Sequence, residues 1–157
     1  MKENYDKALK LVLKYEGNFS HDPIDRGGAT MKGVTQKVYD SFRKLWKLIT
    51  QSVRKISDKE LGDIYKTGYW DTVSGDALPY PVDIVTFDTA VNCGPGRANR
   101  WKDAALNADP KVWAKGIIKL RRLHYATIIK NNPSQIKFKK GWENRVRDLE
   151  KEVGLSN

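Results

Sequence analysis

The sequence predicts a mainly α-helical domain with one small β-hairpin or loop near its N-terminal end. Apolar residues recur at three- and four-residue spacing over most of the 157 residues, which is the period of an amphipathic helix. The exception is segment 17–33, which contains four glycines and Pro23 and is therefore too rich in helix breakers to be helical. The sequence contains no convincing run of strands and no internal repeat.

The first half of the chain is expected to contain three helices. The first spans residues 4–16, carries Glu16 on its apolar face and ends at Gly17. Thr35 is a suitable N-cap for the second, and Ser57 and Glu60 have the spacing of a capping box that begins the third. The second helix carries an apolar stripe that consists of Val38, Phe42, Leu45, Trp46 and Ile49.

The second half is expected to begin with a loop and to continue with helices. The loop is "YWDTVSGDALPYP", and it would expose the aromatic side chains of Tyr69 and Trp70. Gly94 and Pro95 end the first of the helices, and Asp109 begins a long one. The four helices are expected at about residues 82–92, 98–106, 110–132 and 141–153.

The composition argues against several kinds of site. Cys93 is the single cysteine, and only His21 and His124 could serve it as a base, so a catalytic thiol is not favoured. The same residues do not have the spacing of a zinc cluster, and the chain contains no P-loop and no GxGxxG motif. We therefore expect neither a metal nor a cofactor.

The net charge of +10 is concentrated in the C-terminal part of the chain. Residues 1–90 contain 14 Lys and Arg against 13 Asp and Glu, whereas residues 91–157 contain 15 against 6. A basic half of this kind favours a polyanionic partner or is simply a solvated surface. A nucleic acid is not expected, because no helix presents Arg and Asn together as a recognition helix does.

Three residues near the N-terminus have the chemistry of glycoside hydrolysis. An apolar helix face and the negative end of the helix dipole both favour the protonated form of Glu16, as a general acid requires. Asp25 follows nine residues later in a glycine-rich loop and would be the second, ionised carboxylate, while Thr30 could position a water molecule. Asp22 is the competitor of Asp25, but Asp22-Pro23 is more typical of the start of a turn.

The segment "YEGNFSHDPIDRGGATMKGVT" resembles the opening signature of glycoside hydrolase family 108. "YKTGYW" resembles a second landmark of that family, and "TFDTAVNCGPGRANRW" to "GWENRVRDLE" resembles the peptidoglycan-binding segment that follows it. The resemblance implies N-acetylmuramidase activity, with Glu16 as the catalytic acid. The spacing of Glu16, Asp25 and Thr30 is also similar to that of phage lysozymes, whose threonine lies one residue further along.

Six further residues are candidates for substrate binding. Tyr69 and Trp70 could stack on sugar rings from their loop. Asp88 and Asn92 are one helical turn apart and could bind amide groups, although Asn92 could equally cap its helix. Trp142 and Arg145 lie near the start of the last helix, where Trp142 belongs either to the core or to a ligand contact. The tryptophans at 46, 101 and 113 follow apolar stripes and are expected in the core.

Together these observations predict a lysozyme-like helical domain that hydrolyses the β-1,4 bond between N-acetylmuramic acid and N-acetylglucosamine. We expect a catalytic region at 1–93 and a peptidoglycan-binding region at 94–157, packed as one globule whose C-terminal helices form the second wall of the cleft. Two alternatives remain open: a lytic transglycosylase that uses Glu16 alone, and a non-catalytic peptidoglycan-binding module.

The biological setting expected from the sequence is that of a phage endolysin. The first sixteen residues lack the apolar core of a signal peptide, so we expect synthesis in the host cytoplasm, holin-dependent release to the cell wall and host lysis. The expected partners are peptidoglycan glycan strands, with contact to an anionic wall or lipopolysaccharide through the basic half. We expect a monomer.

Overall fold

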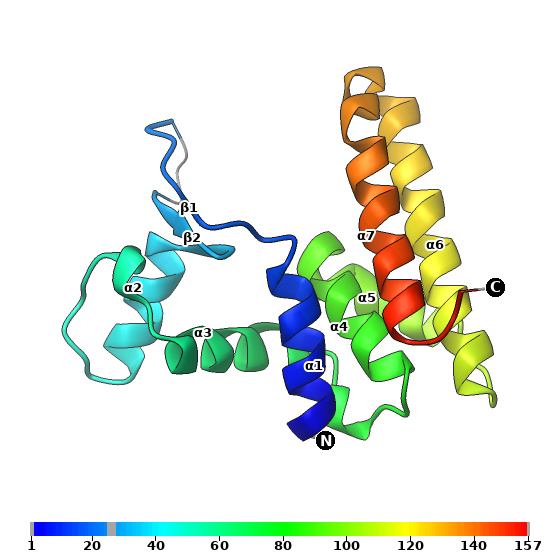
Figure 1. The fold of residues 1–157 in the computed structure, drawn as a ribbon, viewed down its shortest axis with the longest axis horizontal. Helices are drawn as coiled ribbons and strands as arrows, with labels where there is room; N and C mark the ends of the chain where they lie inside the picture. The colour runs from blue at the N-terminus through cyan, green and yellow to red at the C-terminus, as the bar shows by residue number, and fades with distance from the viewer. Residues whose placement is uncertain (1, 25–27, 157) are drawn as a thin grey trace. The chain divides into compact units, whose positions relative to one another are not determined.

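The structure is a computed structural model that describes residues 2–24 and 28–156. The described residues form seven α-helices, several shorter helical segments and one three-stranded antiparallel sheet (Figure 1). This confirms the predicted mainly α fold with a small β element. None of the helices in the described part of the chain is both long and apolar enough to cross a membrane.

The chain folds as two compact units. One contains residues 9–68, and the other contains residues 1–8 together with residues 69–157. These bounds follow packing and differ from those of the expected functional regions, 1–93 and 94–157. The assignment of a separate function to each of those regions stays a prediction.

The unit of residues 9–68 is built around the small sheet and two helices. Its elements are the end of α1 (Lys2–Leu13), the strands β1 (Phe19–Ser20), β2 (Thr30–Met31) and β3 (Val34–Thr35), and the helices α2 (Gln36–Leu45) and α3 (Asp58–Tyr65). The strands are antiparallel in the order β1-β2-β3, with Met31 opposite both Phe19 and Val34. The expected hairpin is therefore present in the segment that is rich in glycine.

Side-chain caps determine where α2 and α3 begin, as the sequence predicted. The Thr35 hydroxyl accepts a hydrogen bond from the Val38 amide at 3.2 Å. Ser57 Oγ accepts one from the Glu60 amide at 3.1 Å, and Glu60 Oε2 accepts one from the Ser57 amide at 3.0 Å. Each cap satisfies amide groups that have no partner within their helix, so both helix starts are fixed locally.

The end of α2 differs from the expectation. The helix stops at Leu45, and the apolar stripe continues into a surface turn instead of entering the core. Trp46 and Ile49 are exposed, so the expectation that Trp46 belongs to the core is wrong. The spacing of apolar residues identifies a face of a helix but does not specify what covers that face.

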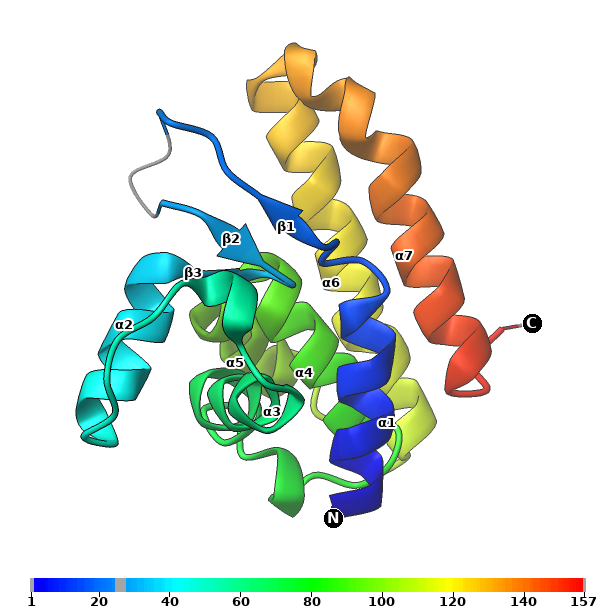
Figure 2. The ribbon, with the colours of Figure 1, turned by 60° about the vertical axis from the view of Figure 1, so that its left-hand side comes forward.

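The other unit is a group of helices around α4. Its main elements are α4 (Val82–Cys93), α5 (Pro95–Ala104), α6 (Pro110–Asn131) and α7 (Lys139–Glu152), which confirm the four predicted helices within a few residues. Helix α4 packs against α5 and α6 and is almost wholly buried, including its polar residues Asp83, Thr86, Asp88 and Thr89. Helices α6 and α7 lie side by side and are joined by the turn Pro133–Phe138 (Figure 2).

Trp70 is a core residue and not part of an exposed loop. It ends a helical segment of π type, Lys66–Trp70, and its side chain is completely buried. Its ring meets Tyr5 and Phe87 edge to face, with centroids 5.3 and 5.5 Å apart, and its Nε1 donates to Asp76 Oδ1 at 3.0 Å. A β-carbon at Gly75 would overlap the indole, so that glycine makes room for the ring. The expectation that Trp70 stacks on sugar from a loop is therefore wrong.

Candidate active site and candidate binding residues

Glu16 lies just beyond α1 and not in its last turn. The helix ends at Leu13, and the amides of Lys14 and Tyr15 donate to the carbonyls of Leu11 and Val12 in the turn that follows the helix. Gly17 follows with φ of 69°, a conformation that suits glycine, so the chain turns away directly after Glu16. The Glu16 side chain is partly buried.

The turn between β2 and β3 approaches Glu16 closely. Lys32 and Gly33 have φ of 48° and 81°, and these positive angles at both central residues match a type I′ hairpin turn. A β-carbon at Gly33 would lie 2.8 Å from Glu16 Oε2 and would overlap the hydroxyl of Tyr65. That hydroxyl donates to the Lys32 carbonyl at 2.8 Å, which ties α3 to the turn. The carboxyl of Glu16 and the hydroxyl of Tyr65 therefore both lie close to the α-carbon of Gly33 in the hairpin turn.

Thr30 and the aspartates of the loop differ in how the structure places them. Thr30 lies in β2, is partly buried and is paired with Ser20 on one side and Thr35 on the other. Asp25 lies outside the described residues, so its role stays a prediction. Asp22 Oδ1 accepts a hydrogen bond from the Ile24 amide at 2.9 Å, in agreement with its interpretation as a turn residue.

Asp88 and Arg145, two of the predicted binding residues, contact each other inside the second unit. Both are buried, with Arg145 Nη2 3.1 Å from Asp88 Oδ1, and Arg121 of α6 donates to Asp88 Oδ2 at 2.6 Å. Burial by itself would raise the pKa of Asp88, but the charges of Arg121 and Arg145 outweigh it and hold that pKa below its ordinary value. Asp88 is thus an ionised partner of two arginines, which corrects the expectation that it binds substrate amides.

Asn92 and Trp142 belong to the neighbouring part of the same cluster. The Tyr125 hydroxyl donates to Asn92 Oδ1 and accepts from Arg121 Nε at 2.7 Å. Burial raises the pKa of Tyr125 to about 12, so its hydroxyl keeps the proton that it donates. Trp142 stacks on the Tyr125 ring with centroids 4.8 Å apart. Four of the six predicted binding residues therefore lie together, joined by Arg121 and Tyr125.

A pocket of about 350 Å³ adjoins this aromatic pair between α6, the following turn and α7. Its lining consists of Arg122, Tyr125, Ala126, Ile129, Ile136, Lys139, Trp142 and Glu143. An aromatic ring beside charged side chains is able to bind a sugar or a peptide. Tyr69 does not belong to this pocket, because it packs against Val73, Ala90 and Ala98.

Sequence reasoning missed Arg121 and Tyr125, although a signal was present. Arg121 follows Ala114, Ile117 and Ile118 at helical spacing on the buried face of α6. A charged residue on such a face needs a buried partner, which is Asp88 here. Burial also raises the pKa of the Cys93 thiol, which is the opposite of what a reactive thiolate requires. The described residues contain no cluster of three or more side chains that could bind a metal ion.

A mainly helical chain with a small antiparallel sheet beside a partly buried glutamate has the arrangement of a lysozyme-like glycoside hydrolase. The sequence profile of the family described as Glycosyl hydrolase 108 matches residues 9–94, more than half of the chain. The protein belongs to this family and is a glycoside hydrolase with peptidoglycan as its substrate.

A solved structure is similar to this protein over the whole chain. The structure "Structure of Brucella abortus SagA" is similar with a TM-score of 0.72 and 26% sequence identity. The match covers 100% of this chain and 98% of that chain. No curated protein matches the sequence.

Substitution of Gly33 by Ala should displace Glu16. The new methyl group would meet Glu16 Oε2 and the Tyr65 hydroxyl, and a side chain at positive φ adds about 1–2 kcal/mol of strain. We expect at least a tenfold loss of peptidoglycan hydrolysis. Turbidity clearing of bacterial cell walls measures the activity, and thermal unfolding measures the strain.

Gly154→Ala is the matched control, because Gly154 has φ of 72° and open space around the position of a β-carbon. It should show similar strain with activity retained. Equal activity of both variants would contradict the role of the Gly33 turn in positioning Glu16.

Two buried aspartates of α4 have pKa values shifted in opposite directions, and their substitution by Asn should affect stability to different extents. Asp88 has a lowered pKa, so its stabilisation is present above its ordinary pKa and is lost as the pH falls through the folded value. Asp88→Asn should lower the free energy of unfolding at pH 7 by about 3–5 kcal/mol, because two buried arginines lose their anion.

Asp83 is the comparison. Burial raises its pKa despite a hydrogen bond from Asn4 at 2.7 Å, so its ionised form costs stability at neutral pH. At pH 7, Asp83→Asn should lower the free energy of unfolding much less than Asp88→Asn does. As the pH falls through the raised pKa, Asp83 of the wild type becomes neutral, and the wild type should gain stability relative to the variant. Denaturant unfolding at about pH 3 to pH 7, the range in which carboxyl groups titrate, tests both variants. Equal losses would show that the arginines do not determine the role of Asp88.

Proposed function

We propose that the protein is an N-acetylmuramidase that cleaves the β-1,4 bond between N-acetylmuramic acid and N-acetylglucosamine. The observation that carries the proposal is the position of Glu16, which lies within the matched family segment and against the Gly33 turn. The close approach of the turn and of Tyr65 limits where the Glu16 carboxyl can point. A general acid has to be held in this way to protonate one particular oxygen of a substrate.

In this mechanism the carboxyl of Glu16 gives its proton to the oxygen that leaves when the glycosidic bond breaks. Asp25 is the second carboxylate, which stabilises the positive charge on the sugar or activates the attacking water. Thr30 orients that water through its hydroxyl. The distance between the two carboxyl groups decides whether the configuration at the cleaved sugar is inverted or retained. Inverting enzymes need roughly 6.5–9.5 Å and retaining enzymes roughly 5–5.5 Å.

The test of this proposal is mass spectrometry of the fragments released from purified sacculi. A muramidase releases fragments that end in a reducing N-acetylmuramic acid. Fragments that end in anhydromuramic acid would identify a lytic transglycosylase instead, and binding without release would identify a non-catalytic module. Host lysis after holin-dependent release stays a prediction. Expression of the protein in bacteria with and without a holin tests it, because lysis should require the holin.

Glu16→Gln should remove hydrolysis while the fold is retained. The amide keeps the size of the carboxyl but has no proton to give, and general acid catalysis typically supplies about 10²–10⁴-fold. Asp25→Asn should also be severely impaired, and Thr30→Val less so. Turbidity clearing gives the rates and circular dichroism checks the fold. A Glu16→Gln variant with more than about half of the normal rate would refute the assignment, because loss of an essential acid costs far more.

The basic C-terminal half should contribute to holding the enzyme on an anionic wall or lipopolysaccharide surface. Lys137, Lys139 and Lys140 lie close to Phe138 and Trp142 in sequence, and Lys139 also lines the pocket beside Trp142. Substitution of the three lysines by Gln should weaken sedimentation with sacculi and make lysis more sensitive to salt. Cleavage of a short soluble glycan should stay unchanged. Equal sedimentation of the wild type and the triple variant from low to high salt would assign these lysines to a solvated surface.

A further inference from the structure

The turn after α2 exposes an unusual group of large apolar side chains. All residues from 44 to 50 are exposed, and the exposed fractions are 79% for Leu45, 62% for Trp46 and 87% for Ile49. Scattered apolar residues are normal on a protein surface, but an adjoining group that includes a tryptophan indicates a binding surface. We call residues 45–49 the apolar loop.

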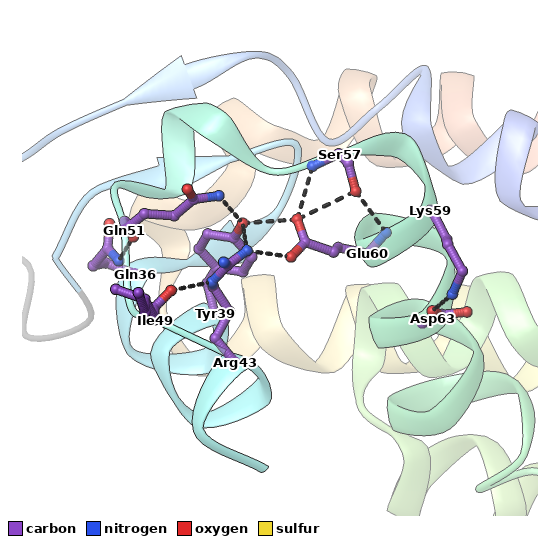
Figure 3. Close-up of polar contacts among 9 residues, drawn as sticks. All are labelled: Gln36, Tyr39, Arg43, Ile49, Gln51, Ser57, Lys59, Glu60 and Asp63. Carbon is purple, nitrogen blue, oxygen red and sulfur yellow. Dashed lines mark hydrogen bonds and ion pairs between the residues drawn. The ribbon is translucent and has the colours of Figure 1, made fainter. Parts of the chain in front are cut away.

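The backbone of the apolar loop is held by hydrogen bonds. Lys47 has φ of 55°, its amide donates to the Lys44 carbonyl at 3.0 Å, and the Leu48 amide donates to the Arg43 carbonyl at 2.7 Å. These two bonds form a Schellman motif, which ends α2 in a defined turn. Arg43 Nε donates to the carbonyl of Ile49 at 2.5 Å and fixes the far end of the loop (Figure 3).

A network of polar side chains holds Arg43, which in turn holds the apolar loop. The Arg43 guanidinium forms an ion pair with Glu60, which also accepts a hydrogen bond from Tyr39 at 2.7 Å (Figure 3). Gln51 donates to the Tyr39 hydroxyl at 2.7 Å, and Gln36 donates to the Gln51 carbonyl at 2.8 Å. The exposure of the loop is therefore maintained by interactions that reach α2, α3 and the segment between them.

The charge around the apolar loop is positive. Residues 41–57 contain five Lys and Arg and no Asp or Glu. Arg43 is paired with Glu60, and Arg54 lies over the ring of Phe19 with its guanidinium carbon 3.5 Å from the ring centre. Lys44 directly precedes the apolar loop, Lys47 lies within it, and both are exposed. The surface thus combines aliphatic side chains, an indole and two exposed lysines.

We propose that the apolar loop binds the surface of a phospholipid bilayer with anionic headgroups. Leu45 and Ile49 would enter the boundary between headgroups and acyl chains, Trp46 would lie at that interface, and Lys44 and Lys47 would contact phosphate groups. Exposed aliphatic side chains add little to the binding of a polar glycan, so peptidoglycan does not account for them. This inference goes beyond the proposed hydrolysis, because lipid binding requires neither Glu16 nor a substrate.

The first experiment is sedimentation of the full chain with phosphatidylcholine vesicles, with and without phosphatidylglycerol. The wild type should bind the anionic vesicles, and the triple variant Leu45→Ser, Trp46→Ser, Ile49→Ser should bind at least about tenfold more weakly. The matched control replaces three exposed apolar residues elsewhere with Ser, namely Leu106, Val112 and Leu123. That control should bind like the wild type, and both variants should keep the thermal unfolding of the wild type because the replaced side chains are exposed.

A second pair of variants tests the charge. Lys44→Gln with Lys47→Gln should weaken binding to anionic vesicles by roughly fivefold per lysine and reduce its sensitivity to salt. Lys111→Gln with Lys115→Gln removes the same charge from exposed positions of α6, within the basic half, and should weaken vesicle binding much less than the loop pair does. Equal losses in the two pairs would show that net charge alone attracts the protein and would overturn the proposal.

A third measurement leaves the apolar loop intact. Thr50 is exposed beside Ile49, and Cys93, the single cysteine, is buried, so a polarity-sensitive dye can be attached to Thr50→Cys. Its emission should shift to the blue on anionic vesicles, whereas a dye on Ser156→Cys should not shift. The proposal is overturned if neither dye shifts, or if the triple Ser variant binds vesicles like the wild type. It is also overturned if the loop binds only lipopolysaccharide, or if it mediates dimerisation without vesicle binding.

Discussion

The geometry around Glu16 depends on a position that has no room for a side chain. Gly33 completes a type I′ turn at φ of 81°, and Glu16 and Tyr65 occupy the space next to its α-carbon. The turn can therefore approach Glu16 and the end of α3 this closely only because residue 33 is a glycine. A general acid has to be aimed as well as protonated, and this close contact limits the directions available to the carboxyl.

Each unit contains a carboxylate that is paired with arginine. In the unit of residues 9–68, Glu60 accepts hydrogen bonds from its helix cap and from Tyr39 while it also pairs with Arg43. In the other unit, Asp88 lies between Arg121 and Arg145 and joins α4 to α6 and α7. Removal of Asp88 would leave two buried arginines without their anion, which is destabilising. Both clusters join separate helices within their unit.

The Asp88 cluster also gives a physical account of the aromatic pair beside the pocket. Arg121 orients the Tyr125 hydroxyl, and the Tyr125 ring is the surface on which Trp142 stacks. A network that looks structural at its buried end therefore reaches a partly exposed tryptophan. The apolar loop after α2 shows the same principle, because Arg43 and Glu60 hold from below a surface that faces solvent.

The sequence by itself determined the local structure and the candidate chemistry. Caps at Thr35 and Ser57 and the glycine-rich segment predicted the helix starts and the hairpin, because hydrogen bonds between near neighbours decide these features. The spacing after Glu16 indicated a glycoside hydrolase, which the family assignment confirms. Only the tertiary structure decided that Trp70 is buried, that Trp46 is exposed and that Asp88 pairs with Arg121 and Arg145. Burial and long-range ion pairs depend on which distant segment covers a side chain, and the periodicity of one helix contains no information about that segment.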